Sequence, residues 1–154
     1  MNRLVCGDNL DELPKLPKES FDLVYADPPF FSNRHYEVIW GDEAEVRSFE
    51  DRWKGGINYY TEDWMRPRIE AIRDVIKPTG SFYLHCDWHA NAHLRILLDE
   101  VFGKENFLNE IIWAYESGGR ATYHFHRKHD TIFLYARDAA KHAYYFGLFA
   151  HSCG

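Results

Sequence analysis

Cysteines, long apolar runs and metal-binding pairs are all scarce in this 154-residue chain. Its three cysteines, Cys6, Cys86 and Cys153, show no paired spacing, so we expect reduced thiols in a cytoplasm rather than a disulfide framework. No apolar run is long enough to span a bilayer and no signal peptide is recognisable, so a membrane partner is not expected. Neither H-E-x-x-H nor C-x-x-C occurs, so no paired motif predicts a metal site.

Positive charge is in deficit as well. The chain has 18 Lys and Arg against 24 Asp and Glu, a formal net charge of −6. The whole molecule is therefore not a basic clamp for nucleic acid, and any such contact has to come from local patches. Apolar side chains (45%) and aromatic side chains (17%) are plentiful, which argues against disorder and suffices for the core of one domain.

The chain is organised around a strand that ends at two prolines. The apolar run that begins at Phe21 stops at Asp27, and Pro28 and Pro29 follow. Because proline has no N–H and a fixed φ, the strand has to end there, and the residues before each proline are held extended. Asp27 to Phe30 therefore form a stiff elbow at the carboxyl end of a strand, where open α/β sheets bind ligands. A carboxylate (Asp27), a free carbonyl (Pro28) and a flat ring (Phe30) suit a planar ligand with an exocyclic amino group.

The remaining pattern predicts an α/β fold. Apolar residues at helical spacing indicate a helix over 61–76, with Thr61 as its N-cap and a turn at 77–80. That helix joins the strand before the elbow to a second apolar strand at 81–85, which makes a βαβ unit. Further elements are expected as a strand at 3–6, a helix at 9–16 capped by Asp8, a helix at Asn91–Phe102 ended by Gly103, and strands at 109–115 and 131–136.

The motif at the elbow and its surroundings carry a family resemblance. Asp27-Pro28-Pro29-Phe30 resembles the D-P-P-Y/F motif of the β-class DNA amino-methyltransferases, which methylate adenine N6 or, with Ser first, cytosine N4. Three further stretches resemble the family in the same order, namely Val5 to Leu10, Ile76 to His85, and the pair Asn109 to Trp113 and His129 to Tyr135. The resemblance covers residues 1–137. It implies a partial Rossmann-like sheet of an S-adenosylmethionine-dependent methyltransferase, with helices on its faces and a C-terminal strand pair.

The resemblance also implies a chemistry for the elbow. Asp27 and the Pro28 carbonyl would accept the two hydrogens of the amino group, Phe30 would stack on the flipped base, and Pro29 would complete the catalytic set. The family more often has Tyr where Phe30 stands. Asp at position 27, rather than Ser, favours adenine over cytosine. The cofactor is S-adenosylmethionine, and Gly7 and Asp8, together with Asp27, are the expected cofactor-binding residues; a capped turn is an equally good interpretation of Gly7-Asp8.

DNA is the expected partner. Ser32, Asn33 and Arg34 follow the elbow directly and are candidates for contact with a phosphate or the flipped nucleotide, with loop solvation as the alternative. A second candidate contact is the densest basic cluster of the chain, in the loop between the last two strands, which contains Arg120, Arg127 and Lys128. The aromatic-rich residues 31–60 are expected to form a lid over the substrate.

The sequence departs from the family pattern at its end. Family members carry a C-terminal F-x-G-x-G segment that forms the floor of the cofactor site, and these 154 residues contain none. Residues 138–154 do not match the family and are expected to be a truncated tail. A separate polypeptide or a second copy would then supply the missing cofactor-binding half.

Two alternatives to an active methyltransferase stay open. One is a remnant that binds nucleic acid or a partner without catalysis. The other is a zinc-dependent hydrolase, because clustered potential ligands suit that metal. These residues are Cys86, Asp87, His89, His93, His124, His126 and His129.

Overall fold

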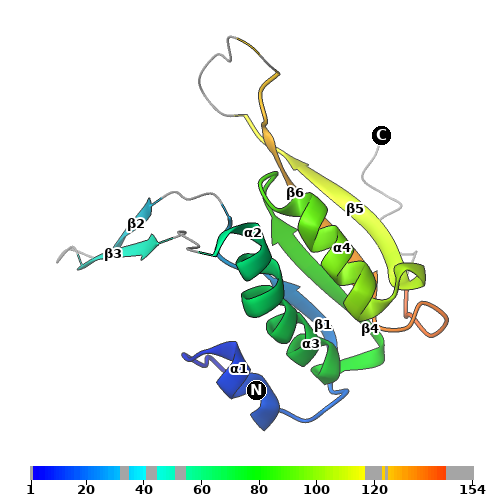
Figure 1. Cartoon of the computed structure of the whole chain (residues 1–154). Helices are drawn as coiled ribbons and strands as arrows, with labels where there is room; N and C mark the ends of the chain where they lie inside the picture. The colour runs from blue at the N-terminus through cyan, green and yellow to red at the C-terminus, as the bar shows by residue number, and fades with distance from the viewer. Residues whose placement is uncertain are drawn as a thin grey trace, which may run out of the picture.

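The computed structural model describes residues 2–31, 35–40, 45–50, 55–116, 123 and 125–144, with the backbone alone for 35–40 and 45–50. In chain order the elements are α1 (Asn9–Glu12), the 3₁₀ helix η1 (Leu13–Lys15), β1 (Phe21–Ala26), β2 (His35–Trp40), β3 (Glu45–Glu50), α2 (Gly56–Asn58), the π-helix η2 (Tyr59–Met65), α3 (Arg66–Val75), β4 (Ile76–Cys86), α4 (Asn91–Phe102), the 3₁₀ helix η3 (Lys104–Asn106), β5 (Phe107–Ala114) and β6 (His129–Ala136). Helices and strands alternate along the chain, which confirms the α/β class (Figure 1).

The main sheet has four strands in the order β1-β4-β6-β5. β1 and β4 run parallel, whereas β6 is antiparallel to both of its neighbours, β4 and β5. The parallel β1–β4 pair is the predicted βαβ unit, and β5 and β6 are the predicted C-terminal strand pair. The sheet thus places the carboxyl ends of β1 and β4 at the same edge.

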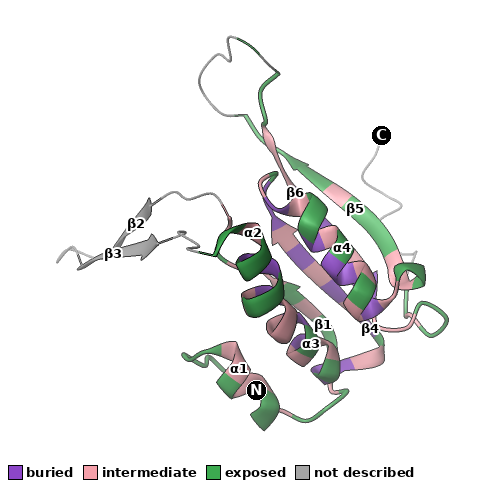
Figure 2. Cartoon of the chain, viewed as in Figure 1, coloured by how far each residue is buried: buried purple, intermediate pink, exposed green. Residues whose placement is uncertain are grey.

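The core lies between this sheet and the helices α3 and α4, which lie side by side over one face (Figure 1). Alternate residues of β4 (Phe82, Leu84 and Cys86) are buried beneath them, while the intervening Tyr83 and His85 point to the opposite face and are half-buried. In Figure 2 the buried residues gather along the inner sides of α3 and α4 and along β4. The helices contribute Ile69, Ile72, Val75, Leu94, Leu97, Leu98 and Phe102 to this core.

The helix predicted at 61–76 begins earlier, and Thr61 is not its N-cap. α2, η2 and α3 follow one another directly, so Thr61 lies inside a helical run and is buried. Its hydroxyl donates to the Ile57 carbonyl at 2.9 Å, which is the bond that a threonine makes to the preceding turn within a helix. The capping chemistry of Thr61 is therefore used in the helix interior. The helix predicted over Asn91–Phe102 has the predicted bounds, and Gly103 follows it with φ of 93°.

Two other expected boundaries are corrected. Residues 3–6, predicted as a strand, form none, and Leu4 is 98% exposed. A strand needs a neighbour for its backbone groups, and no described strand lies beside this stretch. The turn predicted at 77–80 belongs to β4 as an irregularity, because Phe21 pairs with Ile76 whereas Leu23 pairs with Ser81.

The segment predicted as a lid, residues 31–60, has regular structure in its described parts. β2 pairs antiparallel with β3, from His35 opposite Glu50 to Trp40 opposite Glu45. The residues from Gly56 onward already belong to the helical run. The action of residues 31–60 as a lid stays a prediction.

Candidate active site

The elbow lies where the two parallel strands end. Ala26, the last residue of β1, pairs with Leu84, and β4 continues for two residues to Cys86. Asp27 therefore emerges beside His85. Side chains alternate along β1, so Val24 and Ala26 pack against the core while Tyr25 and Asp27 share the opposite face. The elbow consequently borders both faces of the sheet edge.

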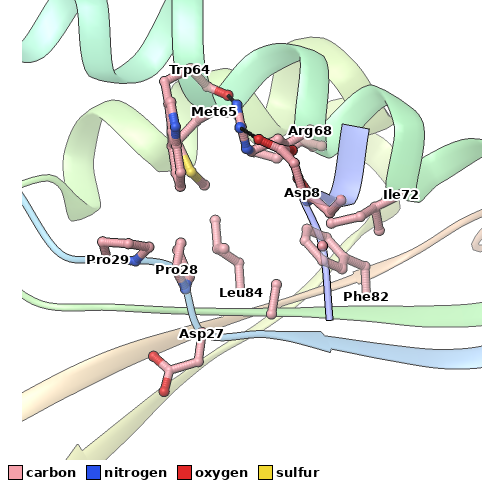
Figure 3. Close-up of a pocket in the computed structure, with 14 residues that line it drawn as sticks. Asp8, Asp27, Pro28, Pro29, Trp64, Met65, Arg68, Ile72, Phe82 and Leu84 are labelled. Carbon is pink, nitrogen blue, oxygen red and sulfur yellow. Dashed lines mark hydrogen bonds and ion pairs between the residues drawn. The ribbon is translucent and has the colours of Figure 1, made fainter. Parts of the chain in front are cut away.

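On the helix side, the elbow closes one wall of a cavity of about 350 Å³, a volume within the range of small-molecule sites. Figure 3 shows Pro28 and Pro29 on one side of this cavity, Trp64 and Met65 across from them, and Leu84 and Phe82 along the sheet. The lining residues are Gly7, Asp8, Asn9, Ala26, Asp27, Pro28, Pro29, Trp64, Met65, Arg68, Ile69, Ile72, Phe82 and Leu84. The walls are mostly apolar and aromatic, and charged groups lie at one end.

That charged end is formed by Asp8 and Arg68. Asp8 caps α1 as predicted, because its Oδ1 accepts from the Leu10 N–H at 2.9 Å. Its Oδ2 accepts from Arg68 Nη2 at 2.8 Å. Arg68 also donates to the Trp64 carbonyl at 3.0 Å, and its guanidinium lies 4.2 Å from the centroid of the Trp64 ring. The capping interpretation and the pocket interpretation of Asp8 are therefore both correct in geometry.

The carbonyl of Pro29 is held by a buried tyrosine. Tyr60, fully buried in η2, donates its hydroxyl proton to this carbonyl at 3.0 Å. Its ring stacks on Trp64, with centroids 5.9 Å apart, and contacts Phe31 at 5.5 Å. The π-helix thereby fixes the second proline of the elbow.

The Asp27 carboxylate points away from the cavity (Figure 3). It is 61% exposed, and its Oδ1 lies 3.6 Å from Nδ1 of His85. Phe30 meets the same imidazole edge-on, with ring centroids 5.4 Å apart. The opposite side of the elbow therefore presents a carboxylate and an aromatic ring beside a histidine.

Two further side chains complete this second group. The Tyr25 hydroxyl lies 3.1 Å from His85 Nδ1, and Asp130 Oδ2 lies 3.5 Å from His85 Nε2. Burial, reinforced by the negative charges of Asp27 and Asp130, raises the pKa of Tyr25, so this phenol keeps its proton at neutral pH. The elbow thus separates an apolar cavity from a polar cluster, an arrangement that can hold a bulky ligand on one side and a planar group with an amino function on the other.

The basic candidates are only partly in the described structure. Ser32, Asn33, Arg34 and Arg120 lie outside the described residues. The exposed Arg127 places its guanidinium 3.6 Å from the centroid of the Trp88 ring, in the turn that follows β4. Lys128 is half-buried, and its carbonyl accepts from the Tyr115 N–H at 3.0 Å. The structure therefore brings Arg127 to the edge of the sheet that bears the elbow.

The candidate zinc ligands do not converge in the described structure. Among the described residues, no group of three or more His, Cys, Asp or Glu side chains is placed to hold a metal ion. His89 instead pairs its Nδ1 with Asp87 Oδ2 at 2.5 Å, and burial raises the pKa of the Cys86 thiol. No helix in the part of the chain that the structure describes is long and apolar enough to cross a membrane.

Sequence reasoning missed most of the cavity lining and the polar cluster. The sequence pattern predicts Trp64 and Arg68 only as part of an ordinary helix, although their spacing of four residues after Tyr60 puts all three on one side of the helical run. The alternation of side chains along a strand could have placed Tyr25 beside Asp27, and the end of the second strand could have added His85. No sequence signal indicated Asp130.

Comparison with known proteins assigns the family. Residues 21–149, most of the chain, match the family model described as DNA methylase. The chain belongs to the DNA methylase family. This membership confirms the resemblance drawn from the elbow motif, and the match includes β1, the elbow and the sheet as far as β6.

Curated relatives of this DNA methylase are restriction-modification and DNA adenine methyltransferases. The chain is 30% identical over 119 residues to the type II methyltransferase M.KpnI of Klebsiella pneumoniae, covering 75% of this chain and 27% of that protein. It is 25% identical over 142 residues to the DNA adenine methyltransferase YhdJ of Escherichia coli K12, covering 92% and 43%. The chain thus spans less than half the length of these curated relatives.

Solved structures show the same fold. The PvuII cytosine-N4-specific DNA methyltransferase superposes with a TM-score of 0.59 at 16% identity, over 86% of this chain and 48% of that one. TTHA0409 of Thermus thermophilus, named as a DNA modification methylase and crystallised with S-adenosyl-L-methionine, superposes with a TM-score of 0.56 at 16% identity, over 90% and 55%. The sheet and its helices therefore form the Rossmann-like fold expected from the sequence.

Proposed function

We propose that this DNA methylase transfers a methyl group from S-adenosylmethionine to the exocyclic amino group of a flipped DNA base. The observation that carries the proposal is the elbow itself, which borders a ligand-sized apolar cavity on one side and presents a carboxylate and an aromatic ring on the other. Adenine N6 is the proposed acceptor, because Asp rather than Ser stands at position 27. The relationship to a DNA adenine methyltransferase supports this choice, whereas the similarity in fold to a cytosine-N4 enzyme does not bear on it.

The residues of the cavity fit the proposed methyl donor. A volume of about 350 Å³ with mostly apolar walls suits a nucleoside of this size, whose rings bury well against Trp64 and Phe82. Asp8 offers a carboxylate to polar groups of the ligand, and Arg68 holds that carboxylate in place. The donor supplies an electrophilic methyl group on a sulfonium. Further donor contacts, equivalent to the F-x-G-x-G segment, have to come from residues outside these 154, in the same polypeptide, a separate one or a second copy.

The other side of the elbow fits the acceptor. An amino nitrogen of a base shares its lone pair with the ring and is a poor nucleophile. Two hydrogen-bond acceptors on its hydrogens turn that lone pair toward the donor, and Asp27 and the Pro28 carbonyl are the groups proposed for this task. Phe30 offers its face to the base, which has to leave the duplex to reach it. Holding both reactants in line supplies much of the rate in such a transfer.

The basic residues are proposed as DNA contacts. Arg127 stands on the ring of Trp88 at the edge of the sheet that bears the elbow, where a phosphate of a duplex approaching the elbow would pass. Lys128, Arg120, Ser32, Asn33 and Arg34 are proposed on the family resemblance alone. Residues 31–60 are proposed to close over the substrate.

The test is transfer of tritium from methyl-labelled S-adenosylmethionine to unmethylated genomic DNA by the full-length protein. Asp27→Asn keeps the shape of the side chain but removes the charge, and it should abolish transfer, as should Phe30→Ala. Asp63→Asn is the matched control, because Asp63 is an exposed aspartate in η2. Nucleoside mass spectrometry of the product should show N6-methyladenine; N4-methylcytosine would reverse the choice of acceptor.

Donor binding is measured separately by isothermal titration. We expect stoichiometric binding of S-adenosylmethionine that survives Asp27→Asn, because that carboxylate points away from the cavity. Full methylation activity in Asp27→Asn would overturn the proposed role of the elbow. Absence of both binding and transfer in the wild-type protein would overturn the proposed function.

A further inference from the structure

One imidazole in the polar cluster has no part in the function proposed above. His85, at the end of β4, lies between Asp27, which follows β1, and Asp130 of β6. Its Nδ1 is 3.6 Å from the Asp27 carboxylate and its Nε2 is 3.5 Å from the Asp130 carboxylate, and the side chain is 18% exposed. Nε2 is buried and has no hydrogen-bond partner among the described residues. A buried polar ring that faces two carboxylates calls for an explanation.

Tyr25 fixes the orientation of this ring. Its hydroxyl lies 3.1 Å from His85 Nδ1, and its raised pKa keeps the hydroxyl protonated. The phenol therefore donates to Nδ1, and the proton of a neutral imidazole has to sit on Nε2, which faces Asp130. Asp130 in turn accepts from the Tyr115 hydroxyl at 3.3 Å. Two tyrosines and an aspartate thus define one position and one tautomer for His85.

The imidazole so fixed touches both functional side chains of the elbow. Phe30 meets its ring edge-on at 5.4 Å. Asp27 is largely exposed, and His85 is the one basic side chain within 4.0 Å of its carboxylate in the described part of the chain. Without His85, therefore, no described basic side chain selects a rotamer for Asp27.

We propose that His85 is a positioning residue of this site, which fixes the Asp27 carboxylate and the Phe30 ring relative to each other. A planar base that enters beside Phe30 then finds the carboxylate already at the distance of its amino group. The inference rests on the proposed function, in which Phe30 stacks on the base and Asp27 accepts an amino hydrogen. It adds a residue whose effect is on turnover and not on binding of the methyl donor, because the donor cavity lies on the other side of the elbow.

Two substitutions separate the two contacts of His85. His85→Asn keeps a polar atom near the position of Nδ1 but removes the ring, whereas His85→Phe keeps a ring against Phe30 but removes both nitrogens. Misplacing a reacting group by about 1 Å costs roughly 100-fold, so we expect His85→Phe to lower kcat by about 10- to 100-fold. The KM for S-adenosylmethionine should not change, and His85→Asn should recover part of the loss. His93→Asn, the same change at an exposed position of α4, is the control and should leave kcat unchanged.

A third substitution acts on His85 from a distance and keeps the test valid if His85→Phe does not fold. Tyr25→Phe removes only the hydroxyl of a half-exposed side chain, and it should lower kcat in the same direction by a smaller factor. In the double variant with His85→Asn, the two losses should not add, because Tyr25 acts through His85. Nitrogen-15 NMR should show a protonated Nε2 and an unprotonated Nδ1 in the wild type, with this preference lost in Tyr25→Phe.

The outcomes separate this proposal from the proposed function. Wild-type kcat in both His85→Asn and His85→Phe, while Asp27→Asn is inactive, would refute the role of His85 and leave the function standing. Fully additive losses for Tyr25 and His85, or a loss that appears only in the KM for the donor, would refute it as well. A wild-type protein that transfers no methyl group would refute the proposed function, and the NMR measurement would still decide whether Tyr25 sets the tautomer.

Discussion

The hydrogen bond from Tyr60 to Pro29 gives a direct test of how the π-helix supports the elbow. Tyr60→Phe removes one oxygen atom from a fully buried side chain and leaves its ring contacts with Trp64 and Phe31 in place. The bond is 3.0 Å long and joins a hydroxyl donor to a carbonyl acceptor. A neutral hydrogen bond of this kind contributes about 1 kcal/mol, and an acceptor left buried without a partner costs about 1–3 kcal/mol.

Two features of the site place the expected loss at the lower end of that range. The ring contacts of Tyr60 are kept, and Pro29 lines the cavity, so water can reach its carbonyl once the hydroxyl is gone. We therefore expect the free energy of unfolding to fall by about 1–1.5 kcal/mol. In urea this loss lowers the midpoint by roughly 0.5 M, and in a thermal scan it lowers Tm by roughly 3–5 °C.

The chain provides a matched control in the adjacent residue. Tyr59→Phe removes the same atom from a tyrosine that is 44% exposed, and it should change the urea midpoint by less than about 0.2 M. Methyl transfer should fall in Tyr60→Phe by more than the unfolded fraction accounts for, because the elbow loses a fixed point. Equal midpoints and equal transfer rates for the two variants would refute the argument that this bond holds the elbow.

Two predictions concern stability away from the elbow. Gly80→Ala should destabilise the protein by about 1–3 kcal/mol in urea titrations, because the new methyl group would lie 2.9 Å from the backbone carbonyl oxygen of Asp22; Gly7→Ala, whose methyl group meets only the flexible side chain of Glu12, should cost much less. Burial and the bond to Asp99 raise the pKa of Tyr135. The stability that this protonated group contributes is therefore present below its unfolded pKa of about 10 and is lost as the pH rises further. Urea midpoints at about pH 8 and about pH 11 should fall more steeply in the wild type than in Tyr135→Phe, and equal slopes would contradict the assignment.

The parts of the fold that were predictable are those set by local chemistry. Proline ends β1 at the elbow, Asp8 caps α1, and Gly103 follows α4, because each of these residues acts on its own backbone or on the next turn. The stretch at residues 3–6 has the composition of a strand, but a strand also requires a neighbour, and composition does not supply one. The prediction for Thr61 is wrong for a related reason, since its hydroxyl can bond either to the turn ahead or to the turn behind.

The site divides along the same line. The elbow could be found from sequence because its residues are contiguous, and the family resemblance gave them roles. The polar cluster could not be found, because it is assembled from residues on separate strands, and only the pairing of β4 with β1 and β6 brings His85 to Asp27 and Asp130. The cavity lining from Trp64 and Arg68 depends on the rotation of a helical run, which in turn depends on a π-helical segment that no local residue announces.

The π-helix η2 makes the length of the chain, and not only its composition, a determinant of the cavity. A π-helix closes each turn with one residue more than an α-helix does. Loss of a single residue between Gly55 and Arg66 would allow the segment to rewind as an α-helix, with α3 and its buried stripe undisturbed. Everything before the deletion would then rotate by about 100° relative to α3. Tyr60 would turn away from Pro29 although its own codon is intact, so in the divergence of related chains this wall of the cavity is more sensitive to insertions and deletions than to most replacements.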